Sequence, residues 1–72
     1  METNKIIEIG QIFKNKRISQ KITQKDFAKE LGISYYYLCR IENGKLNNYS
    51  IDVFIKICEK LNLNILTLSN YE

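Results

Sequence analysis

The chain contains no histidine, no proline and no tryptophan, and only two of its 72 residues are cysteines. Without histidine, no Ser-His or Cys-His pair can activate a nucleophile, and no glycine-rich phosphate loop is present. The two cysteines, Cys39 and Cys58, are too few for the four nitrogen or sulfur ligands of a usual zinc site. We therefore expect no metal, no cofactor and no enzymatic activity. We interpret both thiols as small packing groups rather than as a redox switch.

Long apolar runs are also missing. Runs of aliphatic residues and phenylalanine, such as Val53 to Ile55, are only about three residues long, whereas a membrane-spanning helix needs about 20 apolar residues. Nothing resembles a signal peptide, so the expected location is the cytoplasm and no membrane contact is expected. The length predicts one domain over residues 1–72, with its core at about 6–68.

The net charge of +3 is unevenly distributed along the chain. Residues 1–36 carry seven lysines or arginines against four acids, while residues 37–72 carry four of each. Excess lysines usually lie on the solvated surface and have no specific ligand. The charge therefore permits nucleic-acid binding without establishing it.

The recurring pattern is apolar spacing of three and four residues, which predicts helices throughout. Ile6, Ile9 and Phe13 form one such stripe and predict a first helix over about residues 4–19. Thr23 is typical of a helix N-cap, so a second helix should begin at Gln24 and end at Gly32.

A third helix should follow almost at once. Ser34 predicts its N-cap, and the helix should run from Tyr35 to about Asn43 before Gly44. Two short helices joined by Gly32-Ile33-Ser34 must cross steeply, which indicates a helix-turn-helix. This motif needs a small residue, a glycine and two branched apolar residues at set positions, and these are Ala28, Gly32, Leu38 and Ile41.

The last third of the chain predicts two further helices. Ser50 should cap a fourth helix, and Phe54, Ile57 and Leu61 should face inward from it. Asn62 could end that helix, and a short fifth helix should start after Asn64. The expected fold is therefore an all-α, five-helix domain with a helix-turn-helix formed by its second and third helices.

Several runs together resemble the phage-repressor (Xre-like) helix-turn-helix family. These are Ile9 to Phe13 with Arg17, Thr23-Gln24, Phe27-Ala28, Leu31 to Ser34, Leu38 and Arg40 to Lys45. The chain departs from the family pattern at Lys21, where a glycine often ends the first helix, and at Asn48 and Tyr49, which stand around the usual proline. The loop from Gly44 to Ser50 is also about one residue longer than the family typically has.

The resemblance implies roles for five residues. Gln24, Asn43 and Lys45 match positions that contact DNA phosphates in the family, although Asn43 could instead only cap its helix. Arg17 and Glu42 match a buried ion pair that ties the first helix to the third. In this family the third helix enters the major groove of DNA.

The outward face of the third helix is unusual because it begins with three tyrosines. A helical projection with Leu38 and Ile41 inward places Tyr36 and Arg40 on the opposite side. We expect Arg40, Tyr36 and Tyr35 to read bases and Tyr37 to contact a phosphate. The alternative for Tyr35 and Tyr37 is packing at the edge of the core.

Two functions follow from these features. The first is a transcriptional regulator, expected to act as a homodimeric repressor of a phage, plasmid, conjugative or restriction-modification locus, with a pseudo-palindromic double-stranded DNA operator and no small-molecule ligand. The apolar residues Ile65, Leu68 and Tyr71 are the expected dimer contacts. The second is an antitoxin or other protein-interaction module whose DNA binding is secondary.

Overall fold

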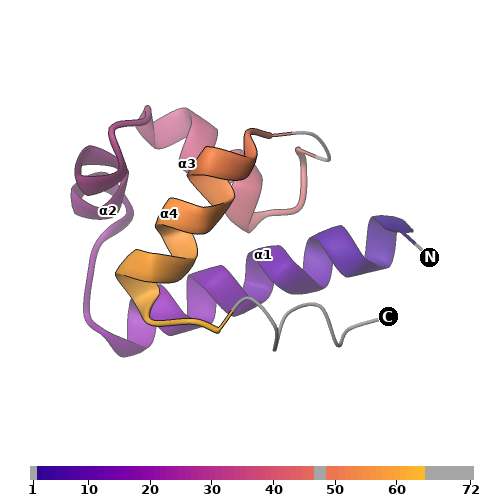
Figure 1. Ribbon diagram of the computed structural model, residues 1–72, viewed down its shortest axis with the longest axis horizontal. Helices are drawn as coiled ribbons and strands as arrows, with labels where there is room; N and C mark the ends of the chain where they lie inside the picture. The colour runs from indigo at the N-terminus through magenta and orange to yellow at the C-terminus, as the bar shows by residue number, and fades with distance from the viewer. Residues whose placement is uncertain (1, 47–48, 65–72) are drawn as a thin grey trace.

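The computed structural model describes residues 2–46 and 49–64. Four α-helices occupy this part of the chain: α1 (Glu2–Ser19), α2 (Gln24–Leu31), α3 (Tyr35–Glu42) and α4 (Ile51–Leu61). The long helix α1 runs along one side of the domain, and the three shorter helices pack together beside it (Figure 1). The all-α prediction is confirmed, whereas the expected fifth helix and the residues Ile65, Leu68 and Tyr71 lie outside the described residues.

Each of the three shorter helices begins directly after the serine or threonine that was expected to cap it. The hydroxyl of Thr23 accepts a hydrogen bond from the backbone N–H of Asp26, and that of Ser34 accepts one from Tyr37. Ser50 accepts from both Asp52 and Val53. These bonds satisfy N–H groups that have no partner inside the helix, so the helix starts are fixed by local sequence.

All four of these helices end in the same backbone arrangement. A residue just past each helix has a positive φ, and the residue after it donates its N–H to a carbonyl five residues earlier, as Ile22 does to Arg17 and Ile33 to Ala28. This is the Schellman motif, in which glycine is preferred because a Cβ is strained at positive φ. The positive-φ residues at the four helix ends are Lys21, Gly32, Gly44 and Asn62.

Lys21 and Asn62 are the two members with a Cβ, and Lys21, with φ of 61°, lacks the short amide that lets asparagine tolerate this conformation. The substitution Lys21→Gly should therefore stabilise the domain by about 1 kcal/mol, since a left-handed conformation costs a residue with a side chain about 1–2 kcal/mol and glycine loses part of that gain to chain entropy. A gain of this size raises the melting temperature of so small a domain by about 4–8 °C. Lys21→Ala, which removes the charge but keeps the Cβ, is the control for thermal melting, and equal melting temperatures for the two variants would contradict this explanation.

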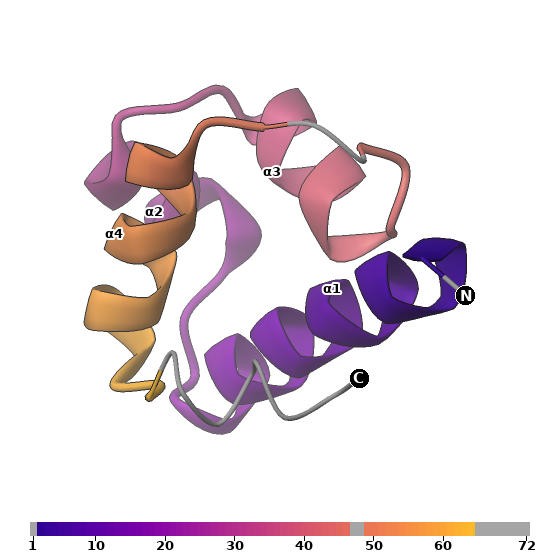
Figure 2. The same ribbon diagram turned by 45° about the vertical axis from the view of Figure 1, so that its right-hand side comes forward.

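The core lies where the four helices meet. Phe13, Phe27, Leu38, Ile57 and Leu61 are completely buried, and Ala28, Leu31, Ile41 and Cys58 are nearly so. The view in Figure 2 shows α2, α3 and α4 arranged around this centre with α1 across their open side. Of the four residues expected at set positions of the helix-turn-helix, Ala28, Leu38 and Ile41 are therefore in the core, and Gly32 is exposed at the turn.

Two further contacts hold α4 against α1. The rings of Phe13 and Phe54 lie 5.7 Å apart between centroids, and Phe54 in turn contacts Tyr49 at 6.4 Å. The amide of Gln20 donates a hydrogen bond of 3.0 Å to the carbonyl of Leu61 at the end of α4.

In the part of the chain that the structure describes, no helix is both long enough and apolar enough to cross a membrane.

Candidate nucleic-acid interface

Helix α3 has one buried face and one exposed face. Leu38, Ile41 and Glu42 are at most 1% exposed, whereas Tyr36 is 68% exposed. This matches the projection made from the sequence, in which Tyr36 lies opposite the core. An eight-residue helix with large side chains on its free face is well shaped to enter the major groove of DNA.

The exposed face is organised by contacts between Tyr36 and Arg40. The guanidinium carbon of Arg40 lies 5.6 Å from the centre of the Tyr36 ring, a cation-π distance. One terminal nitrogen of Arg40 donates to the Tyr36 hydroxyl at 3.3 Å, and the other donates to the carbonyl of Lys45 at 3.5 Å. Arg40 is therefore held over the helix surface from both ends of α3.

The other two tyrosines occupy different environments. Tyr35 is 48% exposed, and a hydrogen bond with the side chain of Cys39 raises the pKa of Tyr35 above its ordinary value. Tyr37 is half-buried and packs against the core. Tyr37 lies close to Tyr49. Burial is the main reason why the pKa of Tyr49 is raised to about 12. The environment of Tyr37 thus fits packing at the core edge, and its phosphate contact stays a prediction.

The predicted ion pair between Arg17 and Glu42 is present and buried. Nε of Arg17 lies 2.8 Å from Oε2 of Glu42, and the two side chains are 7% and 0% exposed. A second hydrogen bond of 3.2 Å joins Nη2 of Arg17 to Oε1 of Glu42. Nη1 of Arg17 donates to the carbonyl of Ile22 at 2.7 Å. The pair therefore links the end of α1, the turn that follows it and the end of α3.

Gln24 joins this network, which sequence reasoning did not anticipate. Its Nε2 donates a 3.0 Å hydrogen bond to Oε1 of Glu42, so the first residue of α2 is oriented by a buried carboxylate of α3. The amide keeps one N–H that this bond does not use. Asn43 is the exposed C-cap of α3, and Lys45 is exposed two residues later. The phosphate contacts expected for Gln24, Asn43 and Lys45 remain predictions.

Gly10 is a second residue whose role the sequence did not reveal. A Cβ built on Gly10 would lie 2.5 Å from the carbonyl oxygen of Ile41 and 2.8 Å from that of Glu42. The glycine therefore lets α1 approach the backbone at the end of α3 very closely. A glycine inside a helical pattern is a signal of such a contact, but it does not indicate the partner.

Comparisons with known proteins agree with this geometry. A family model described as helix-turn-helix matches residues 13–72. The "ImmF control region 10 kDa protein" of Bacillus phage phi105 is 35% identical over 66 residues, which cover 90% of this chain and 73% of that protein. No solved structure matches the chain. From the match over most of its length, the chain belongs to the phage-repressor-like (Xre-like) helix-turn-helix family of DNA-binding regulators.

Proposed function

We propose that this chain is a sequence-specific repressor that binds double-stranded DNA as a homodimer at a phage or related mobile-element locus. The observation that carries the proposal is the free face of α3, where Tyr36 and Arg40 are presented by a helix whose other face is anchored in the core. The similar phage protein is described by its name as belonging to a control region, which supports a regulatory role.

Arg40 is the best candidate for direct base readout. Its guanidinium has five N–H donors, and the contacts to Tyr36 and Lys45 use two of them. The remaining donors can serve the O6 and N7 acceptors of a guanine, while the exposed ring of Tyr36 offers an apolar surface to a thymine methyl group.

The expected partner arrangement follows from the small size of this face. One eight-residue helix contacts few base pairs, so useful specificity requires two copies on a pseudo-palindromic operator with half-sites about one helical turn apart. Selection of bound sequences from random duplex DNA tests the proposal, and light scattering of the resulting complex gives its stoichiometry. Selection of paired half-sites by two protein copies supports it, whereas failure to enrich any sequence would contradict it.

The substitution Arg40→Ala should relax preference at one base pair of the operator. We expect a loss of about 1–3 kcal/mol on the operator and a smaller loss on random DNA, because only the operator offers the guanine contact. Binding titrations on both duplexes measure this difference. The companion variant Tyr36→Phe keeps the ring, so it should bind nearly as the unsubstituted protein if the ring reads a methyl group. Equal losses on both duplexes for Arg40→Ala and for Tyr36→Ala would show that this face does not read bases.

A further inference from the structure

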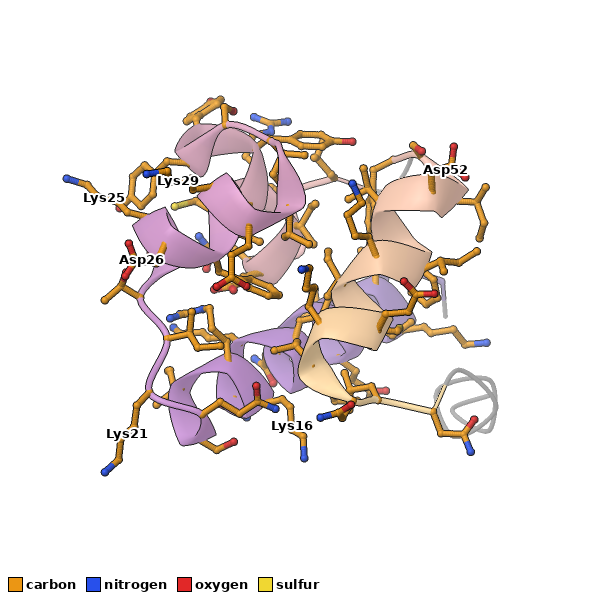
Figure 3. The ribbon with its side chains drawn as sticks, turned by 60° about the vertical axis from the view of Figure 1, so that its left-hand side comes forward. Lys16, Lys21, Lys25, Asp26, Lys29 and Asp52 are labelled. Atoms are coloured by element: carbon orange, nitrogen blue, oxygen red, sulfur yellow. The ribbon has the colours of Figure 1, made fainter. Side chains whose placement is uncertain are left out.

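A pair of lysines on α2 is available for a second set of DNA contacts. Lys25 and Lys29 are four residues apart and both are exposed. Figure 3 shows both lysines on α2, with the side chain of Lys25 extending outward from the domain. Residues at this spacing lie on one face of a helix, about 6 Å apart along its axis. We refer to Lys25 and Lys29 as the basic edge.

Among residues 2–46 and 49–64, the ammonium groups of the basic edge form no ion pair. Asp26 and Glu30 each follow a lysine by one position and point about 100° around the helix from it, while Asp26 also precedes Lys29 by three positions and lies on its side of the helix. Over residues 2–46 and 49–64, the structure has an ion pair between Arg17 and Glu42 but none at either lysine. Two exposed cations with no ion-pair partner in the described part of the chain can therefore both meet an external anion.

The position of the basic edge connects it to the face of α3. Lys25 directly follows Gln24, whose amide is bonded to Glu42 at the end of α3. Helix α2 packs against α3, so a duplex held by α3 passes close to the start of α2.

We infer that the basic edge binds two phosphates of the DNA strand that flanks the bases facing α3. This inference rests on the proposed function and adds phosphate contacts that lengthen the stretch of DNA covered by the protein. Because lysine contacts a phosphate without reading a base, the edge supplies affinity and leaves the preferred sequence unchanged. Its occupant is the same duplex, outside the half-site read by Tyr36 and Arg40.

The test compares two matched double variants on the duplex that the unsubstituted protein selects. Lys25→Ala/Lys29→Ala removes the basic edge, and Lys56→Ala/Lys60→Ala removes an exposed lysine pair of the same spacing on α4. Each lost phosphate contact lowers the salt slope by about 0.9, and the homodimer carries two basic edges with four lysines, so the first variant should lose about 3.6 units and the second none. The affinity deficit of the first variant should then be about 150-fold larger at 50 mM salt than at 200 mM.

A shortened duplex separates a local contact from a general effect of charge. On DNA trimmed to the selected half-sites, the unsubstituted protein should show the same reduced slope as Lys25→Ala/Lys29→Ala. Equal slopes for both double variants, or a slope that trimming does not change, would overturn the inference while leaving the proposed function intact. Absence of binding to any duplex by the unsubstituted protein would overturn both.

Discussion

Replacing Glu42 with alanine is expected to destabilise the domain by about 3–5 kcal/mol, because its removal leaves a buried guanidinium without a counter-charge. The carboxylate is fully buried and is the acceptor for three hydrogen bonds, two from Arg17 and one from Gln24. A chain of 72 residues has a total stability of only about 4–11 kcal/mol, so the variant should be largely unfolded well below the melting temperature of the unsubstituted protein.

A double variant distinguishes this uncompensated charge from a general loss of packing. Arg17→Met/Glu42→Leu removes both charges and keeps similar volumes, so it should be more stable than Glu42→Ala alone. Circular dichroism during thermal and urea denaturation measures all three proteins. If Glu42→Ala melts at the unsubstituted temperature, the ion pair contributes nothing to the fold and the explanation by buried charge is wrong.

The second large effect is expected for Gly10→Ala. The added methyl group would lie 2.5 Å from the carbonyl oxygen of Ile41, and because that atom belongs to the backbone it cannot turn away. Helix α1 would have to move from α3, at a cost of about 1–3 kcal/mol from overpacking. This loss should exceed the gain of about 1 kcal/mol that alanine normally brings to a helix interior.

Gly32→Ala is the natural comparison for this variant. Gly32 has φ of 74°, but a Cβ built there meets nothing within 4 Å. Its cost should therefore come from backbone strain alone, at about 1–2 kcal/mol. Urea denaturation gives the free energy of unfolding for each variant, and a Gly10→Ala protein about 1 kcal/mol more stable than the unsubstituted one would show that α1 and α3 can separate without penalty.

The fold was largely predictable because its boundaries are encoded locally. Thr23, Ser34 and Ser50 each cap the helix that follows, and Gly32 and Asn62 each end one, as their residue types indicated. Capping needs only the residue and its next three neighbours, so it can be read from a short stretch of sequence. The first helix begins two residues earlier than expected, where no capping residue marked its start.

Contacts between distant segments were predictable only where the family resemblance supplied them. The Arg17–Glu42 pair was expected on that basis, and its geometry is confirmed. By contrast, the bond from Gln24 to Glu42 and the approach of α1 at Gly10 depend on how three helices are placed in space. Neither a residue type nor a spacing along the chain contains that information.

The residues on the two faces of α3 have different roles. Leu38, Ile41 and Glu42 hold the domain together, while Tyr36 and Arg40 contribute little to its core. If α3 reads DNA as proposed, substitutions at the outward positions should alter which DNA sequence is preferred without reducing the small stability of the domain. A regulator built in this way would be free to diverge in target choice, even though its buried framework tolerates little change.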